Sequence, residues 1–270
     1  MRRFPSETSV PLTHAEEKSL SKLHERSGRI AQGVFLAEGI RVLEEAFRHE
    51  KCPETLFVDA GGLDEREHEI RELFAKRGAR IRPLPSKQIA KLSTVDQPQG
   101  LIGCFPLDRP SLSALKKPSR VLWCHTITDP GNMGTIFRSA LAFGVDQAIC
   151  SGKGVDPHHD KVIRASAGAV FGLTLVEAGD ADILTWCGTI RARLLALALQ
   201  GKGWREVADT LLNPKKRSPL VIVVGNEAHG LPTLILDEAT EIVRIEQDAS
   251  VESLNAAVAC SILLYETQQS

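Results

Sequence analysis

The chain has 270 residues, of which 43% are hydrophobic and 25% charged, and its formal net charge is −1. This is the balance of a globular protein with one large or two modest domains, and the net charge argues neither for nor against a polyanionic partner. The longest strongly apolar stretches, such as residues 220–224, have the length of strands, which excludes a membrane span. The charged N-terminus has no apolar segment behind it, so we expect no signal peptide and a cytoplasmic protein.

The first part of the chain alternates helical and strand-like patterns. A polar arm at residues 1–18 precedes apolar residues that recur at helical spacing between Leu20 and Phe47. The pattern then predicts strands over residues 55–58, 79–84 and 100–105, and helices over residues 64–77 and 86–92. This order predicts a small α/β domain over residues 1–105.

Residues 106–120 contain three prolines, several serines and basic residues, and we interpret them as an interdomain linker. Beyond it, we expect strands over residues 121–124, 147–151, 172–176, 194–199, 220–224 and 242–245, with helices over residues 133–143 and 253–265. Uninterrupted apolar strands are typical of parallel sheets that are buried on both faces. The sequence therefore predicts a parallel-sheet α/β domain over residues 121–270.

The spacing of the cysteines, histidines and basic residues indicates which kinds of binding site to expect. The six cysteines form no C-x-x-C pair, and we interpret them as buried thiols rather than metal ligands or a disulfide framework. His158 and His159 are adjacent rather than at ligand spacing, so we expect no metal. Basic clusters occur near residues 76–91, 109–120 and 215–217. Each alone is typical of a solvated face, but three in a neutral chain favour a phosphate-binding surface.

Residues 128–140 form the first segment that could carry catalytic chemistry. The segment follows a predicted strand and opens a predicted helix. Met133, Ile136 and Phe137 form its apolar stripe, and Arg138 lies on another face. An arginine near the start of a helix opposes the helix dipole, which favours anions there. The simpler interpretation is a surface arginine. The alternative is an arginine directed at an anion or a developing oxyanion.

Two later segments have the same strand–loop–helix form. In residues 220–231 a buried strand leads into Gly225, Asn226 and Glu227, at the carboxyl end of a strand where open α/β sheets bind ligands. In residues 245–259, Ser253 and Asn255 stand at a helix start, where side-chain caps are common. Capping alone would explain much of each segment taken by itself.

The order and spacing of the three segments resemble the SpoU (TrmH-like) family of RNA ribose 2′-O-methyltransferases. The resemblance covers residues 121–266 and includes residues 156–157 and 161–168. Residues 33–44 and 99–100 resemble the small ribosomal-protein-like RNA-binding domain that accompanies many family members. The resemblance implies S-adenosyl-L-methionine as cofactor, a deep trefoil knot in the C-terminal domain, and a homodimer with its site at the subunit interface.

The resemblance also implies roles for individual residues. The implied catalytic residues are Asn132, Arg138, Glu227, Ser253 and Asn255. The implied cofactor-binding residues are Val224, Gly225, Asn226, Gly230, Ile245, Gln247, Ser253 and Leu254, and the implied RNA-binding residues are Arg29, Arg41, Lys161 and Arg164. Because a guanidinium stays protonated in proteins, we interpret Arg138 as a clamp on the developing alkoxide rather than as the base.

One departure from the family pattern leaves a second hypothesis open. Glu246 and Gln247 stand where family members usually have a proline and an apolar residue, in the loop that would contact the adenine. They favour a non-catalytic RNA-binding protein that has kept the knotted fold. A small-molecule α/β enzyme is a third possibility, consistent with the near-zero net charge. The leading hypothesis is methylation of a ribose 2′-hydroxyl, in ribosomal RNA rather than tRNA.

Overall fold

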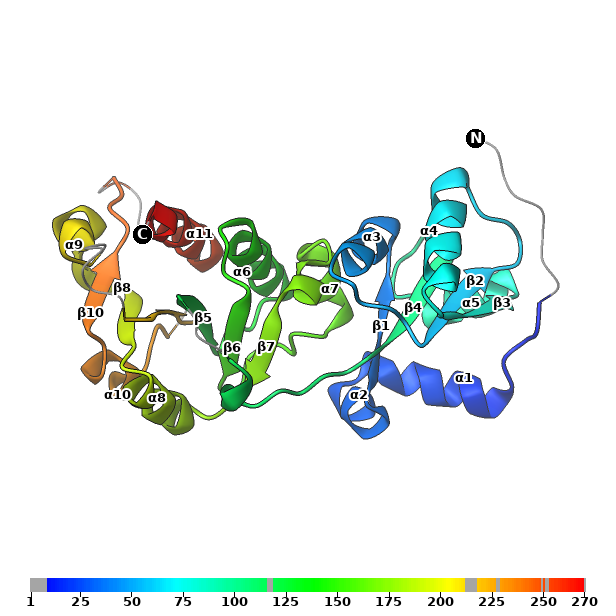
Figure 1. The fold of residues 1–270 in the computed structure, drawn as a ribbon, viewed down its shortest axis with the longest axis horizontal. Coiled ribbons are helices and arrows are strands. Elements are labelled where there is room, and N and C mark those ends of the chain that lie inside the picture. The colour runs from blue at the N-terminus through cyan, green and yellow to red at the C-terminus, as the bar shows by residue number, and fades with distance from the viewer. Residues whose placement is uncertain are drawn as a thin grey trace. The chain divides into compact units, whose positions relative to one another are not determined.

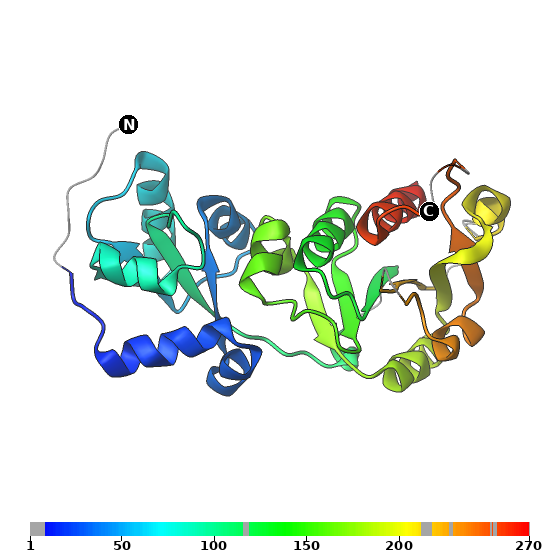
Figure 2. The same cartoon turned by 180° about the vertical axis from the view of Figure 1, so that it is seen from behind.

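The computed structural model describes residues 9–115, 119–211, 218–226, 229–248, 250 and 253–269. The chain forms two compact units (Figures 1 and 2). The first consists of Met1–Asp108 and His158–Gly172, and the second of Arg109–Pro157 and Leu173–Ser270. The segment His158–Gly172 therefore belongs to the first unit by its contacts, although it lies between two strands of the second. The linear division at residues 1–105, 106–120 and 121–270 stays a proposal.

The first unit is a mixed four-stranded sheet with helices around it. Its strands are in the order β1-β4-β2-β3. β1 and β2 are each antiparallel to β4, and β2 is parallel to β3. The elements are α1 (His14–Ser21), η1 (Lys22–His24), α2 (Arg26–Gln32), β1 (Val34–Glu38), α3 (Ile40–Arg48), β2 (Thr55–Asp59), α4 (Glu65–Lys76), β3 (Arg80–Leu84), α5 (Ser86–Leu92) and β4 (Leu101–Pro106).

Local capping explains why α4 begins where the sequence predicts. The Asp64 carboxylate accepts from the Glu67 N–H at 2.8 Å, and the Glu67 carboxylate accepts from the Asp64 N–H at 2.9 Å. This reciprocal pair satisfies two backbone donors that the helix itself cannot. Glu67 also accepts from the Gly100 N–H at 2.9 Å, which ties α4 to the start of β4.

Residues from the middle of the chain complete this first unit. They form α7 (Asp160–Ala165) and η3 (Ala169–Gly172). The Phe171 ring lies 4.7 Å from that of Phe105 and 5.8 Å from that of Phe35, between centroids. On the polar side, Arg164 Nη1 donates to Thr94 Oγ1 at 2.6 Å. Aromatic packing and this hydrogen bond therefore hold the segment on the first sheet.

The second unit is a six-stranded sheet in which every described pair of strands is parallel, in the order β10-β8-β9-β5-β6-β7. Its elements are η2 (Leu112–Ala114), β5 (Arg120–His125), α6 (Pro130–Ala142), β6 (Gln147–Ser151), β7 (Thr174–Glu177), α8 (Asp180–Thr189), β8 (Arg193–Gly203), α9 (Trp204–Leu211), β9 (Leu220–Val224), α10 (Thr233–Asp237), β10 (Glu241–Arg244), α11 (Ala256–Glu266) and η4 (Thr267–Gln269).

Helices cover both faces of this sheet, which is why its central strands are apolar throughout. α8 and α10 pack on one face, where Ile183 and Ile235 join a core that includes Trp123. α6 and α11 lie side by side on the other face (Figures 1 and 2). All five residues of β9 are buried. The expectation of an α/β protein whose C-terminal sheet is parallel is confirmed.

Several details differ from the sequence-based expectations. β1 was not predicted, and neither were α7 to α10. α6 begins at Pro130, three residues early, because Asp129 caps it and proline suits the first helical position. Five of the six cysteines are buried as expected, whereas Cys52 is partly exposed. Within the described part of the chain, none of the helices combines the length and apolarity needed to cross a bilayer.

Candidate active site

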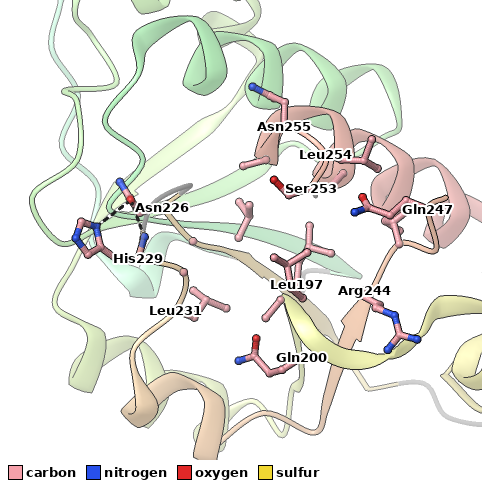
Figure 3. Close-up of a pocket in the computed structure, with 18 residues that line it drawn as sticks. Leu197, Gln200, Asn226, His229, Leu231, Arg244, Gln247, Ser253, Leu254 and Asn255 are labelled. Carbon is pink, nitrogen blue, oxygen red and sulfur yellow. Dashed lines mark hydrogen bonds between the residues drawn. The ribbon is translucent and has the colours of Figure 1, made fainter. Parts of the chain in front are cut away.

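A cavity of about 470 Å³ opens at the carboxyl ends of β8, β9 and β10, beside the start of α11 (Figure 3). Parallel α/β sheets bind their ligands at this edge. The cavity is lined by Leu197, Ala198, Leu199, Gln200, Val224, Gly225, Asn226, His229, Gly230, Leu231, Arg244, Ile245, Gln247, Ser253, Leu254, Asn255, Ala256 and Ala259. The structure thus brings together all eight residues predicted to bind the cofactor.

An interruption in the pairing of β8 with β10 forms one wall of the cavity. Ile242 pairs with Ala196, but the next residue, Val243, pairs with Lys202. Among the described pairs, residues 197–201 of β8 therefore have no partner in β10, and four of these five residues line the cavity. Leu199 is 63% exposed there. An exposed leucine at the end of a buried sheet gives the wall an apolar contact surface for a ligand.

The loop after β9 is held by close backbone contacts. A Cβ atom on Gly225 would lie 2.6 Å from the Gly230 carbonyl oxygen, so only glycine fits at this position. Asn226 and Gly230 form an isolated β-bridge, in which the Gly230 N–H donates to the Asn226 carbonyl at 2.8 Å. Gly230 has a φ of 65°, in the left-handed region that glycine adopts readily. The need for glycine at positions 225 and 230 thus has a local structural cause.

Asn226 joins this loop to the loop that leads into α6. Its Nδ2 donates to the Thr126 carbonyl at 3.1 Å and to Thr128 Oγ1 at 3.5 Å. Its Oδ1 accepts from the His229 N–H at 3.2 Å and lies 3.3 Å from His229 Nδ1 (Figure 3). One amide therefore connects the cavity to the segment that carries Asn132 and Arg138.

The start of α11 connects the cavity directly to α6. Asn255 Oδ1 caps the helix by accepting from the N–H groups of Ala257 and Val258, at 2.8 and 3.3 Å. Because its oxygen is used in this way, its Nδ2 is free to donate to Asn132 Oδ1 at 2.9 Å. Two residues predicted to be catalytic from segments 123 positions apart are thus in contact. α11 begins at Ala256, so Ser253 and Leu254 belong to the preceding loop.

Glu246 and Gln247, the two residues that differ from the family pattern, lie in different environments. Glu246 does not line the cavity, and its Oε1 accepts from the Arg205 N–H at 2.9 Å, at the start of α9. Burial raises the pKa of Glu246, but this hydrogen bond and the charges of Arg205 and Arg244 outweigh it and lower that pKa overall. Gln247 lines the cavity. Of the two residues, only Gln247 is placed to affect a ligand there.

Two residues predicted to be catalytic stand apart from the cavity or cannot be placed. Arg138 is exposed on α6 and does not line the cavity. Its guanidinium makes no hydrogen bond or ion pair with the described residues. Glu227 lies outside the described residues.

The four residues predicted to bind RNA all belong to the first unit. Arg41 and Lys161 are exposed. Arg164 forms a 2.9 Å ion pair with Asp160. Arg29 is only 2% exposed, and its Nη1 donates to the carbonyls of Leu23 and His24 at 2.8 and 3.1 Å. A buried guanidinium that satisfies carbonyls has a structural role, so we do not retain Arg29 in the proposed RNA surface.

Several cavity residues were missed by the sequence analysis. Leu197 and Leu199 were predicted only as part of a strand, and Gln200 lies just beyond the predicted strand. An irregular pairing with β10 leaves no periodic signal in the sequence. His229 lies within the segment of residues 220–231 singled out in the sequence, but the family resemblance implies no role for that position. Arg244 ends β10 next to Ile245, which was predicted.

Two family models match different parts of the chain. Residues 119–265 match the SpoU rRNA Methylase family, and residues 16–103 match the MRM3-like substrate binding domain. A crystal structure of an AdoMet-bound rRNA methyltransferase from Sinorhizobium meliloti superposes with a TM-score of 0.83 at 27% identity, covering 97% of each chain.

Two curated relatives are similar along nearly their whole length. The 23S rRNA (guanosine(2553)-2′-O)-methyltransferase RlmP of Bacillus subtilis (strain 168) is 25% identical over 92% of this chain and 94% of its own. The 23S rRNA (uridine(2479)-2′-O)-methyltransferase of Streptomyces viridochromogenes is 28% identical over 90% of this chain and 85% of its own.

Proposed function

The chain belongs to the SpoU rRNA methylase family, and we propose that it transfers the methyl group of S-adenosylmethionine to a ribose 2′-hydroxyl of ribosomal RNA. The observation that carries this conclusion is the single cavity in which the residues predicted to bind the cofactor meet. Both relatives described above act on 23S rRNA at a 2′-oxygen. The enzyme is thus an RNA 2′-O-methyltransferase.

The cavity suits S-adenosylmethionine in size and in chemistry. Sites for small ligands typically enclose about 300–1,000 Å³ and combine apolar walls with a few polar groups. The cavity of about 470 Å³ lies within this range. Leu197, Leu199 and Leu254 would pack against the adenosine part, while the side-chain amide of Gln247 would bind its polar groups and Asn226 would hold the wall of the cavity.

The protein's contribution to the chemistry is positioning and charge stabilisation. When bound, S-adenosylmethionine supplies an electrophilic methyl group on a positively charged sulfur. Holding a hydroxyl in line with such a group can supply about 7–11 kcal/mol of the barrier. We assign Arg138 to the developing alkoxide and an adjacent RNA phosphate, because a guanidinium binds oxyanions without losing its proton. Asn132, Asn255 and Ser253, with Glu227, would position the ribose and the cofactor.

We further propose that the first unit binds the RNA. Arg41, Lys161 and Arg164 provide its positive charge toward phosphates. The match of residues 16–103 to a substrate binding domain supports this assignment. Ribosomal RNA is favoured over tRNA because of the relatives named above, and a cytoplasmic location fits their bacterial origin.

A homodimer and a deep trefoil knot are the finer parts of the proposal. α11 leaves Val258 46% and Tyr265 51% exposed, and the Tyr265 ring contacts Phe143 with 5.6 Å between ring centroids. An exposed apolar face of this kind supports a contact with a second copy of the chain, which would bring Arg138 of one subunit toward the cavity of the other. The return of α11 onto α6 supports the knot. Analytical ultracentrifugation tests the dimer.

Two measurements test the function. Calorimetry with S-adenosylmethionine should detect one site per chain, and tritiated cofactor should label ribosomal RNA from cells that lack the protein. Mapping 2′-O-methyl groups in ribosomal and transfer RNA, with and without the protein, then identifies the nucleotide. Absence of cofactor binding together with retained RNA binding would instead support a non-catalytic RNA-binding protein.

A further inference from the structure

The proposed reaction requires a group that accepts the ribose proton, and one cavity residue has suitable chemistry. A ribose hydroxyl is a weak nucleophile until its proton is removed. Among the described residues that line the cavity, only His229 and Arg244 are ionisable. Arginine stays protonated and cannot accept a proton, whereas histidine titrates near neutral pH. His229 is therefore the described side chain at the cavity that can act as a base.

The hydrogen bonds of Asn226 determine which ring nitrogen of His229 is available. Asn226 Nδ2 donates to the Thr126 carbonyl and its Oδ1 accepts from the His229 N–H, which fixes the orientation of the amide. The amide oxygen lies 3.3 Å from His229 Nδ1 and can only accept, so Nδ1 carries the proton in the neutral ring. The lone pair is thereby left on Nε2 of the exposed imidazole.

His229 lies at the end of the cavity that is joined to the loop before α6. Asn226 binds the loop at Thr126 and Thr128, which continues through the helix cap Asp129 into α6. α6 carries Asn132, whose Oδ1 accepts from Nδ2 of the cavity residue Asn255 at 2.9 Å, while in the proposed dimer Arg138 would come from the other subunit. Figure 3 shows Asn226 and His229 on one side of the cavity, with Arg244 and Gln247 on the other.

At the end of the cavity near Asn226, none of the described charged groups binds the His229 imidazole. Arg244 lies on the opposite wall (Figure 3), and the Asp129 carboxylate accepts from the Asn132 N–H at 2.7 Å. No ion pair or hydrogen bond between His229 and a charged group occurs among the described residues. The neighbouring Glu227 lies outside them.

We propose that His229 is the general base of the methyl transfer, an inference that rests on the proposed function. The ribose oxygen attacks the methyl carbon, the carbon–sulfur bond breaks with its electron pair left on sulfur, and the hydroxyl proton moves to Nε2 of His229. The positive charge lost from the sulfonium thus reappears on the imidazolium. Asn226 stabilises that imidazolium through its amide oxygen, and solvent takes the proton afterwards.

Single-turnover methylation of ribosomal RNA from cells lacking the protein tests this role. His229→Asn, whose amide can still donate to Asn226, is expected to lower the rate roughly 10²–10⁴-fold. The pH dependence of the rate should differ between wild type and the variant, because the variant lacks the imidazole base. Added imidazole should partly restore His229→Ala. The matched control is His14→Asn, an exposed histidine in α1 that lies outside the cavity.

Two further measurements do not depend on activity. Long-range ¹H–¹⁵N spectra of the histidine rings, assigned with His229→Asn, should show the neutral ring protonated on Nδ1. Calorimetry should show S-adenosylmethionine binding to the variant within about twofold of wild type. A ring protonated on Nε2, a variant rate equal to wild type at every pH, or a loss of rate explained wholly by weaker cofactor binding would each overturn the proposal. A wild-type enzyme that labels no RNA would instead refute the proposed function and this role with it.

Discussion

Replacement of Gly225 by alanine should damage the cavity more than the fold. The added Cβ would lie 2.6 Å from the Gly230 carbonyl oxygen, 2.7 Å from the Gly230 carbonyl carbon and 2.9 Å from Leu231 Cδ2. The leucine methyl can rotate away, but the carbonyl belongs to a backbone held by the bridge to Asn226. Gly230 and its bridge partner Asn226 must therefore move, and both residues line the cavity.

The size of the effect follows from the cost of overpacking. Inserting one methyl group into a well-packed site typically costs about 1–3 kcal/mol. If the cofactor requires the original loop position, the same free energy raises its Kd about 5- to 150-fold, because 1.36 kcal/mol corresponds to a factor of ten. Any part of the cost that falls on folding lowers the Tm, by roughly 2–4 °C per kcal/mol for a chain of this size.

The matched control is Gly188→Ala in α8. A Cβ at Gly188 would meet no atom within 4 Å, and alanine in a helix is more favourable than glycine by roughly 0.5–1 kcal/mol. Isothermal titration with S-adenosylmethionine and thermal unfolding should separate the two variants. Wild-type affinity together with wild-type Tm in Gly225→Ala would refute the reasoning about the loop.

Three further predictions concern charged side chains. Arg138→Ala should abolish methyl transfer to ribosomal RNA and leave the Kd for S-adenosylmethionine within about twofold, as single-turnover assays and calorimetry would show. Glu246→Ala should lower stability at pH 7 by about 0.5–1 kcal/mol, because it removes the acceptor for the Arg205 N–H. Since the pKa of Glu246 is lowered in the fold, this difference exists above the ordinary value of 4.5 and should vanish as the pH falls through the lowered pKa. Glu38 is 8% exposed, and burial raises its pKa although the Ser93 hydroxyl donates to it. Its stabilising contribution is therefore complete below 4.5 and lost as the pH rises through the raised pKa, so wild type should lose stability relative to Glu38→Gln over that range in denaturant titrations.

Each of these predictions has a result that contradicts it. Retention of wild-type activity in Arg138→Ala would remove that residue from the proposed chemistry. A change of cofactor affinity in Glu246→Ala would show that its carboxylate acts on the cavity rather than on α9. A pH-independent difference between wild type and Glu38→Gln would mean that the carboxyl group titrates alike in the folded and unfolded chain.

Local sequence signals predicted those elements whose structure depends on their own residues. β9 was expected over residues 220–224 and is found there, because five successive apolar residues suit a strand buried on both faces. α5 was likewise expected over residues 86–92. β1 was missed because Val34–Glu38 lies between two helices and its burial depends on pairing with β4, whose partner residues lie 64 (Glu38 with Ile102) to 72 (Val34 with Pro106) positions away.

Features that depend on contacts between residues far apart in the chain could not be predicted from the sequence. The wall at residues 197–201 exists because β8 and β10 change register, and neither strand alone carries a sign of it. The burial of Arg29 depends on two carbonyls of the preceding turn, so its positive charge was misleading as a signal for RNA. The contact between Asn132 and Asn255 was implied only through the family resemblance, because nothing local relates α6 to α11.

The placement of His158–Gly172 has a consequence for recombination and protein engineering. The chain passes between its two units three times, after Asp108, Pro157 and Gly172. A gene fusion that exchanged only residues 1–108 for those of a relative would therefore pair a foreign sheet with the resident Phe171 and Arg164. Such chimaeras should be insoluble or inactive unless the middle segment is exchanged together with the N-terminal one. Inheritance of a new RNA specificity in this architecture thus requires the coordinated exchange of two separate segments, with crossovers at all three boundaries.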